Sequence, residues 1–519
     1  MEDQREVRAF LAKPSSHGLA AGETVEQIET HISVVFLAGE HAFKLKKPVL
    51  MSYLDFSTCA LRKAACEQEL MLNRRTAPEI YEKILPIRRA VDGLHLGGET
   101  GGIIDWLVVM RRFDNQGLLA RMAEEGTLDA ALIGQVAIEA ARLHETAERH
   151  PEAGGADVLR AVAASNLRSF EPAMGKVLPR PAILALHAQT LAAIASHEAL
   201  LEHRRRAGFV RRCHGDLHLG NIVRIGDRPV LFDCIEFNDA FSTIDVLYDL
   251  AFLLMDLAFR AAADARLAGL ANRALNVWLD HVAMPETGAM LEGLAAMPLF
   301  ISLRAAIRSH VDAHDAARAD RARAYLAFAE VALKPGRPRL VAVGGLSGTG
   351  KSTLARGLAP LLGGEVDGAL GAVHLRSDVL RKKMWGVPLL EPLPAEAYTQ
   401  EAGDRVYREL FRLAGLALRA GFPVVLDAVF ARPWERDAAE EAARAAGVPF
   451  QGIWLEAGQA VLEARVENRA MLRTDSSDAD AAVVRRQMAY DTGDIGWRRL
   501  ESEGEPPDVL QRARAILPL

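Results

Sequence analysis

Residues 213–222 read CHGDLHLGNI, which places two histidines, an aspartate and an asparagine in one short stretch. Such a cluster is compatible with a metal site, with a catalytic loop or with an ordinary buried turn. The residues on either side of it decide between these alternatives, and with them the fold of the first two thirds of the chain.

A metal site is the weaker interpretation. His214 and His218 are four residues apart, but the intervening Gly215 argues against a helix that would present both on one face. Apart from Cys213, which adjoins His214, we find no third histidine or cysteine at a spacing typical of a zinc site. None of the four cysteines lies in a Cys-x-x-Cys pair, so the sequence indicates neither a disulfide framework nor a thiolate zinc site.

The spacing of the stretch instead matches a kinase catalytic loop, H-R-D-x-x-x-x-N, with glycine in place of arginine. Asp216 is followed five residues later by Asn221, and an apolar run at 230–232 leads to Asp233. Cys-Ile replaces the Phe-Gly that follows this aspartate in protein kinases. The pattern resembles the aminoglycoside phosphotransferase and choline kinase group over about residues 25–260, which implies a two-lobed α+β fold that phosphorylates small molecules with ATP.

The resemblance also implies roles for individual residues of the loop. Asp216 would accept or orient the proton of the acceptor hydroxyl, and Asn221 and Asp233 would carry magnesium. His214 would be a buried orienting group and His218 a loop residue near the phosphates. Met110 would lie near the hinge whose backbone binds adenine. Asp249, in the run LYDLAF, matches a family aspartate that supports the loop.

A kinase of this kind also needs a cation over the ATP phosphates, paired with a glutamate on a helix. Lys44 and Lys46 share one face of a strand, because strand side chains alternate. We prefer Lys44 for its place in the Phe-Lys-Leu pattern. Glu69 is the preferred partner, with Glu67 as the alternative.

A second set of motifs begins at Gly345, where GLSGTGKS fits G-x-x-x-x-G-K-S after an apolar strand and before a helix. Glycines let backbone amides approach a polyphosphate, and the helix N-terminus adds partial positive charge. Lys351 would reach the β- and γ-phosphates, and the Ser352 hydroxyl would ligate magnesium. The nucleotide-binding residues expected here are Gly345, Ser347, Gly348, Thr349, Gly350, Lys351, Ser352 and Thr353.

Residues 338–500 resemble the small P-loop kinases related to adenylate, gluconate and zeta-toxin kinases. By that resemblance Asp378, followed three residues later by Arg381, would orient the acceptor hydroxyl, and Asp427 would hold the magnesium shell. Arg465 and Arg469 precede the segment 474–483, which resembles the lid that closes over transferring phosphates. Bland alternatives stay open: Asp378 as a helix cap, Asp427 as a strand-end turn, and the two arginines as solvated helix charges.

Local patterns predict the remaining elements. Thr24 and Gln27 have the spacing of a capping box and predict a short helix. A hairpin turns at Gly39-Glu40, a helix covers 59–74, and strand-like runs cover 81–113. Residues 118–206 and 250–333 are mostly helical, and the apolar run 247–259 is interrupted by aspartates, so it predicts a buried helix rather than a membrane span. After residue 338 strands and helices alternate, which predicts a parallel sheet.

The chain of 519 residues is too long for one hydrophobic core. Proline and glycine in the linker 331–340 place a boundary near Gly336. We therefore expect an α+β, protein-kinase-like, two-lobed domain over 1–335, followed by an α/β P-loop domain over 336–519 with a parallel sheet and helices on both faces.

Three functions compete. The first is a bifunctional phosphotransferase that uses ATP and Mg²⁺ at two sites and acts on hydroxyls of small molecules. In the second, only one half is catalytic and the other senses nucleotide. The third is a metal-dependent phosphohydrolase built on the histidine cluster. A net charge of −6 gives no argument for nucleic-acid or membrane partners, and the N-terminus does not resemble a secretory signal, so a cytoplasmic location is expected.

Overall fold

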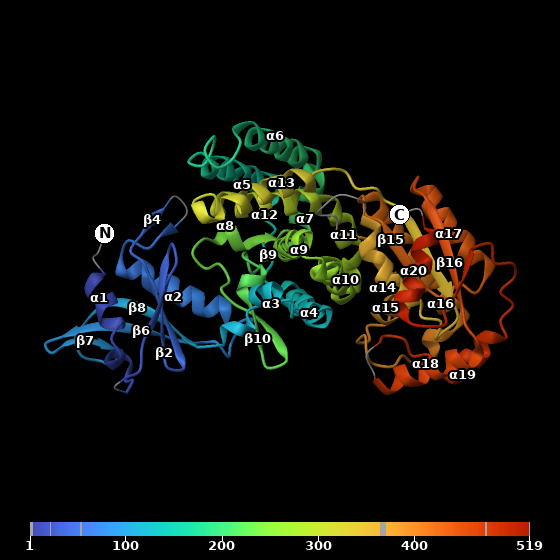
Figure 1. Ribbon diagram of the computed structural model, residues 1–519, viewed down its shortest axis with the longest axis horizontal. Helices are drawn as coiled ribbons and strands as arrows, with labels where there is room; N and C mark the ends of the chain where they lie inside the picture. The colour runs from blue at the N-terminus through green and yellow to red at the C-terminus, as the bar shows by residue number, and fades with distance from the viewer. Residues whose placement is uncertain (1–3, 21, 52–53, 364–369, 473–474, 518–519) are drawn as a thin grey trace. The chain divides into compact units, whose positions relative to one another are not determined.

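The N-terminal part of the chain contains an antiparallel sheet (Figure 1). The computed structural model describes residues 4–20, 22–51, 54–363, 370–472 and 475–517. It contains two compact units, one formed by residues 1–158 and 205–253, the other by residues 159–204 and 254–519.

Six strands build this sheet in the order β1-β2-β3-β8-β6-β7, all antiparallel. The expected hairpin at Gly39-Glu40 is confirmed, since Ala38 pairs with His41 across the turn. The expected strand runs over 81–113 are also confirmed. The strands are β1 (Glu26–Glu29), β2 (Ser33–Ala38), β3 (His41–Lys46), β6 (Tyr81–Ala90), β7 (Gly93–Leu96) and β8 (Gly102–Arg111).

The short helix expected from Thr24 and Gln27 is wrong. Residues Glu26–Glu29 form strand β1, which pairs with β2 from Glu26 opposite Leu37 to Glu29 opposite Val34. All four residues of β1 are exposed, so the segment has no apolar stripe to hold a helix against the core. Pairing with the edge of β2 decides the conformation instead of the local capping pattern.

Helix α2 packs against β6 and β8 and confirms the helix expected over 59–74. Thr58 caps its first turn by accepting a hydrogen bond from the Leu61 amide. On the buried face of α2, Arg62 donates to both oxygens of Asp105 at 2.7 and 3.0 Å. Helix α2 spans Cys59–Asn73, and the other elements of this part of the chain are α1 (Arg5–Leu11), β4 (Leu50–Met51) and β5 (Leu54–Asp55).

The loop 213–222 lies between short strands and buried helices of the same unit. Strand β9 precedes it and pairs with β12, while β10 and β11 form a hairpin after it. The apolar run at 230–232 is in strand β11 only as far as Leu231, where this strand ends. The elements are α3 (Leu119–Glu125), α4 (Ala130–Thr146), β9 (Val210–Arg212), β10 (Ile222–Ile225), β11 (Arg228–Leu231), α8 (Asp239–Ser242), β12 (Thr243–Asp245) and α9 (Val246–Ala263), which continues into the second unit.

Helices occupy the stretches where the sequence predicts them. The run 247–259 lies within α9, whose residues from Val246 to Leu257 are buried, as expected. The segment Met284–Asp312 is long and apolar enough to cross a membrane, but 78% of its most apolar window is buried inside the protein, as in a core helix. The helices are α5 (Gly155–Phe170), α6 (Arg180–Ser196), α7 (Glu198–Arg206), α10 (Leu270–His281), α11 (Met284–Gly293), α12 (Met297–Asp312) and α13 (Ala319–Ala332).

The second sheet is parallel throughout, with strand order β14-β15-β13-β16-β17, which confirms the α/β prediction. Val341 and Val343 face α14 (Lys351–Leu358) and α20 (Pro506–Ile516) on one side of β13. Gly344 faces Trp454 and Phe430 on the other, where Phe430 packs against helix α16. The strands are β13 (Leu340–Gly345), β14 (Val373–Arg376), β15 (Val424–Asp427), β16 (Phe450–Glu456) and β17 (Arg498–Glu501).

The helices of this region connect and cover these strands (Figure 1). They are α14 (Lys351–Leu358), α15 (Ser377–Met384), α16 (Gln400–Arg419), α17 (Pro433–Ala445), α18 (Gln459–Leu472), α19 (Ala481–Met488) and α20 (Pro506–Ile516). Residues 333–339 lie between α13 and β13 outside helix and strand, where the linker was expected. The boundary near Gly336 stays a prediction, because residues 254–335 belong to the same compact unit as the parallel sheet.

Candidate active sites

The loop after β9 is held by hydrogen bonds between its own side chains and backbone. Asn221 donates from Nδ2 to Oδ2 of Asp216 at 2.8 Å and to its carbonyl oxygen at 3.0 Å. The Asp216 amide donates to Nδ1 of His214, whose Nε2 lies 3.0 Å from the Phe232 carbonyl oxygen. Burial lowers the pKa of His214, which favours the neutral ring with Nε2 as donor. Both ring nitrogens of His214 are therefore engaged by the backbone, which leaves neither for a metal.

Gly215 explains why this loop has glycine where protein kinases have arginine. Its φ is +87°, and a Cβ atom there would lie 2.9 Å from the Phe241 carbonyl oxygen. Its amide donates to Oδ1 of Asp249 at 2.7 Å. Only glycine meets both the conformation and the close approach.

A chain of alternating charges connects the first sheet, α2 and the segment after β11. Lys44 Nζ lies 2.7 Å from Oε1 of Glu69 and 2.6 Å from Oδ1 of Asp233. Lys46 Nζ lies 2.5 Å from Oε2 of Glu69 and also binds Glu236. Both lysines thus share one face of β3 and hold the two oxygens of the same carboxylate.

The charges of this chain shift one another's pKa values. Burial would raise the pKa of Glu69, but the two lysines outweigh it and lower the pKa to about 2. Burial would lower the pKa of Lys44, but Asp233 and Glu69 hold it well above its usual value. Burial raises the pKa of Glu236 despite Lys46. Glu67, the alternative partner, is exposed and pairs with Lys63 on the same helix.

Asp233 has an uncommon backbone conformation, with φ of +61° two residues after β11 ends. Aspartate tolerates this left-handed region better than most residues. Its amide donates to the Tyr81 hydroxyl at 3.2 Å, and the next amide, of Cys234, donates to Oδ1 of Asn73 at 2.8 Å. These bonds turn the carboxylate toward Lys44. Met110, at the end of β8, is half-buried in the apolar cluster that also includes Phe232.

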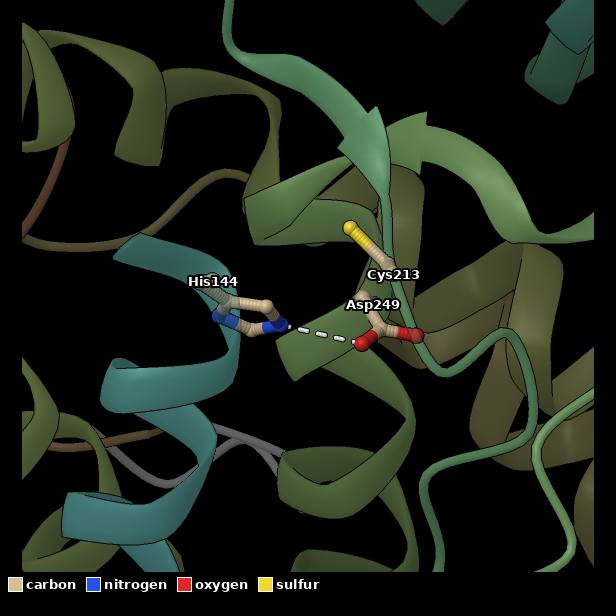
Figure 2. Close-up of side chains that lie close together, drawn as sticks. All are labelled: His144, Cys213 and Asp249. Atoms are coloured by element: carbon tan, nitrogen blue, oxygen red, sulfur yellow. Dashed lines mark hydrogen bonds and ion pairs between the residues drawn. The ribbon is translucent and has the colours of Figure 1, made fainter. Parts of the chain in front are cut away.

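Asp249 supports the loop from helix α9, together with His144 and Cys213 (Figure 2). Its Oδ2 lies 2.9 Å from Nε2 of His144 and 3.2 Å from the His214 amide nitrogen. The three side chains have ligand atoms within 4.8 Å of one another. Burial, with the nearby carboxylates, raises the pKa of Cys213 well above its usual value. Asp249 thus joins helix α9 to the loop by accepting hydrogen bonds from the His214 and Gly215 amides.

The second site surrounds a cavity of about 1350 Å³ in the second unit, at the carboxyl ends of β13, β14 and β15. A Cβ atom at Gly345 would lie 2.7 Å from the Leu455 carbonyl oxygen, and one at Gly348 would lie 2.6 Å from that of Leu462. At Gly350, where φ is +86°, a Cβ atom would meet nothing within 4 Å. Close packing therefore excludes a side chain at Gly345 and Gly348. At Gly350, which lies beside the cavity, only the positive φ favours glycine. The expected nucleotide-binding residues from Ser347 to Thr353 all line it.

Lys351 and Asp427 both face this cavity. Lys351 Nζ donates to the Leu346 carbonyl at 3.0 Å, and burial lowers its pKa against the opposing effect of Asp427 and Asp378. Burial would raise the pKa of Asp427, but the hydrogen bond from His374 and nearby cations hold it well below its usual value. Asp427 is therefore a buried carboxylate that stays ionised beside the glycine-rich loop.

The remaining expected residues also line the cavity. Asp378 lies in the first turn of α15, and Arg381 donates to the Ala397 carbonyl at 2.6 Å. Arg465 donates to the Ser502 carbonyl at 2.9 Å, and Arg469 to that of Ala479 at 3.1 Å, within the expected lid segment. The first residue of that segment, at position 474, lies outside the described residues. Both arginines line the cavity and donate to backbone carbonyls, and their proposed role in the lid stays a prediction.

Comparison with known proteins assigns a family to each half. The family model "Phosphotransferase enzyme family" matches residues 60–286, and the model "AAA domain" matches residues 340–491. The uncharacterized protein Rv2004c of Mycobacterium tuberculosis is 31% identical over 518 residues, which cover 96% of this chain and 98% of that protein. The chain belongs to the same family. An uncharacterized protein of Mycobacterium bovis shows the same identity and coverage.

Solved structures match the two halves separately. A choline/ethanolamine kinase family protein from Mesorhizobium loti is 18% identical with a TM-score of 0.35, covering 63% of this chain and 94% of that chain. A gluconokinase from Sinorhizobium meliloti is 19% identical with a TM-score of 0.24, covering 34% of this chain and 90% of that chain. The two family models place a phosphotransferase-family region before an AAA-domain region in this chain. With the antiparallel first sheet and the parallel second sheet, they confirm the resemblances and the fold class expected from the motifs.

Several residues of both sites have no signal in the local sequence. Glu236, Tyr81 and Asn73 organise the first site, and Arg75 donates to the Arg212 and Cys213 carbonyls before the loop. At the second site, Gln487 accepts a bond from the Ser347 amide at 2.7 Å, and Arg376 binds both oxygens of Asp475. Glu236, three residues after Asp233, and Arg376, two residues before Asp378, lie close enough to a motif to be found from it.

Proposed function

We propose that the protein is a bifunctional phosphotransferase in which each half transfers the γ-phosphate of ATP to a hydroxyl group of a small molecule. One observation carries the proposal: each half gathers, from segments far apart in sequence, a half-buried lysine and carboxylates of the kind that phosphoryl transfer requires. Lys44 lies between Glu69 and Asp233 in the first site, and Lys351 lies with Asp427 and Asp378 at one cavity in the second.

The residues fit magnesium by their chemistry. Mg²⁺ prefers carboxylate, carbonyl and hydroxyl oxygens, and keeps several waters. Asn221 and Asp233 offer such oxygens in the first site, and Ser352 with the ionised Asp427 offers them in the second. Held by these residues, magnesium would supply positive charge against the negative charge of the phosphates.

In the first site, Asp216 would accept or orient the proton of the acceptor hydroxyl. Its Oδ2 is held by the amide nitrogen of Asn221, so the amide oxygen of Asn221 is the atom that would face the ion. Lys44, kept protonated by its two carboxylates, would bind the α- and β-phosphates. A positioned base contributes about 10²- to 10⁴-fold to such a reaction, so loss of the Asp216 carboxylate is expected to be severe.

In the second site, backbone amides of the glycine-rich loop and Lys351 would bind the phosphates. Asp378 would hold the acceptor hydroxyl. Arg465 and Arg469 would stabilise the charge that shifts onto the transferring group, an effect that acts mainly in the transition state. Their carbonyl partners show that both side chains are already directed along the cavity wall.

Equilibrium binding of a non-hydrolysable ATP analogue to the full chain tests the proposal. We expect two magnesium-dependent sites, of which Lys351→Ala removes one and Asp233→Ala weakens the other. A single site that one of these changes leaves intact would overturn the proposal. Formation of ADP with a panel of hydroxyl-bearing metabolites, compared between Asp216→Asn and Asp378→Asn, then shows whether both halves turn over or one only binds nucleotide.

A further inference from the structure

Strand β14 lies at the edge of the parallel sheet, next to β15 only. An edge strand presents backbone groups that need partners. Here two side chains of helix α10 supply them. Asn272 donates from Nδ2 to the carbonyl oxygens of Leu370 and Ala372 at 2.7 and 2.9 Å. Asn276 donates to the Ala372 carbonyl at 3.0 Å and accepts at Oδ1 from the His374 amide at 2.7 Å.

The contact between α10 and this edge is tight and buried. Asn272 and Asn276 are only 6% and 8% exposed, and their spacing of four residues places them on one face of the helix. Gly371 has φ of +74°, and a Cβ atom there would lie 2.7 Å from Nδ2 of Asn272. The two amide side chains thus take the place that a neighbouring strand would have, and the approach leaves room only for glycine.

The same edge strand reaches the second site through His374. The backbone of His374 is bound by Asn276, and its ring Nε2 lies 3.3 Å from Oδ2 of Asp427. The next residues of the chain, Arg376 and Asp378, line the cavity. His374 therefore connects α10 to Asp427: its amide is bound by Asn276, and its ring contacts the carboxylate that faces the cavity with Lys351.

We propose that Asn276 is a positioning residue of the P-loop site, which acts by holding His374 against Asp427. The inference rests on the proposed function, in which Asp427 holds magnesium. Helix α10 lies within the residues that match the phosphotransferase family model, yet it supports the site of the other half. The P-loop segment is then incomplete without a helix that precedes the linker, and the two halves form one functional unit at this point.

The test measures the affinity of the P-loop site for a non-hydrolysable ATP analogue, with magnesium and with a chelator, in a full chain that carries Asp233→Ala to weaken the other site. Partners of metal-binding groups typically contribute about 10- to 100-fold to metal affinity, and Asn276 acts one step further away. We expect Asn276→Leu to weaken magnesium-dependent binding by about tenfold, with metal-free binding unchanged. The control, Asn272→Leu, loses a buried amide that accepts from Asn276 Nδ2 at 3.2 Å but makes no bond to His374. It is expected to keep the ratio of the two affinities.

Two variants of His374 keep the test decisive if Asn276→Leu fails to fold. His374→Leu removes the donor to Asp427 and is expected to reproduce the loss, while His374→Gln, which retains a side-chain N–H, is expected to restore most of it. In the His374→Leu background, Asn276→Leu is expected to have no further effect on the ratio. An equal loss with and without magnesium, or the same ratio for Asn272→Leu and Asn276→Leu, would reduce Asn276 to a packing role and overturn the inference.

The proposed function fails in a different way. If Lys351→Ala leaves nucleotide binding unchanged, the P-loop site itself is disproved. If Lys351→Ala removes the site while His374→Leu leaves its magnesium dependence as in the parent chain, only the role of Asn276 and His374 is disproved.

Discussion

The Nζ atom of Lys44 lies 2.6 Å from Oδ1 of Asp233, a contact between residues 189 positions apart in the sequence. The lysine belongs to the first sheet and the aspartate to the segment after β11, so the ion pair joins the two lobes of the first unit. Both groups are proposed to bind one nucleotide, the lysine through the phosphates and the aspartate through magnesium. Lys44 also binds the buried Glu69, and the Asp233 amide donates to the Tyr81 hydroxyl. These bonds limit how far either residue can move.

Substitution of the two lysines is expected to separate ligand binding from stability. Lys44→Met removes the proposed phosphate contact, and a charged hydrogen bond of this kind contributes about 1.5–3 kcal/mol. The affinity of the first site for the ATP analogue should then fall by about 10- to 100-fold, as measured by calorimetry in the Lys351→Ala background. A larger affinity loss for Lys46→Met than for Lys44→Met would show that the other lysine binds the phosphates.

Lys46→Met is expected mainly to destabilise the fold. Lys46 is fully buried, and its loss leaves Glu236 without this cation in the core. Removal of one partner of a buried ion pair costs about 3–5 kcal/mol, measurable by urea unfolding. Because burial raises the pKa of Glu236, this group stabilises the fold when protonated and loses that contribution as the pH rises through its pKa. The cost of Lys46→Met should therefore be larger at pH 8 than at pH 5, and an equal cost at both would contradict the assignment of Glu236.

Two glycines of the P-loop offer a matched comparison, because both have φ of +86°. Alanine at either position meets the same backbone strain, about 1–2 kcal/mol. At Gly348 the added methyl group would also lie 2.6 Å from the Leu462 carbonyl oxygen, whereas at Gly350 it enters open space beside the cavity. Gly348→Ala should lower the free energy of unfolding more than Gly350→Ala, and Gly350→Ala should weaken nucleotide binding more than its stability cost implies. Nucleotide binding that Gly350→Ala leaves unchanged would place the nucleotide elsewhere.

Motifs of neighbouring residues predicted most of both candidate sites, because loops such as 214–221 and 345–352 carry their chemistry within a few positions. Their physical supports could not be predicted in this way. Glu236 binds Lys46, which is 190 positions away in sequence, and Asn276 binds the His374 amide in strand β14. The wrong helix at Thr24 has the same origin: a local capping pattern cannot show that the edge of β2 lies nearby.

Lys383 is expected to make the stability of the fold depend on pH in the alkaline range. Burial lowers its pKa to about 8, with Asp280 opposing the shift, and its Nζ donates to the Leu279 carbonyl at 2.9 Å. A lysine with a lowered pKa binds fewer protons when folded than when unfolded between about pH 8 and 10.5, so its contribution to stability rises with pH in this window. The difference in thermal midpoint between the parent chain and Lys383→Met should shift in favour of the parent from pH 7 to pH 10. A pH-independent difference would contradict the buried position of this amine.

Asp249→Asn tests whether the cluster of Asp249, His144 and Cys213 supports the loop or holds a metal. In the native protein, Asp249 accepts from the Gly215 and His214 amides and contacts His144. Asparagine has nearly the same shape, but one of its two ends is a donor, which would face a backbone N–H or the imidazole. An unsatisfied buried group of this kind costs about 1–3 kcal/mol and displaces the backbone of the loop that carries Asp216.

We therefore expect Asp249→Asn to lower ADP formation at the first site by about tenfold or more, with little change in nucleotide binding at the P-loop site. The first rate is read in the Lys351→Ala background and the second by calorimetry. A support role also predicts that a zinc chelator leaves the thermal midpoint of the parent chain unchanged, because Asp249 is already engaged by the Gly215 and His214 amides and by His144. A midpoint that falls with chelator in the parent but not in Asp249→Asn would instead identify a structural metal at this cluster.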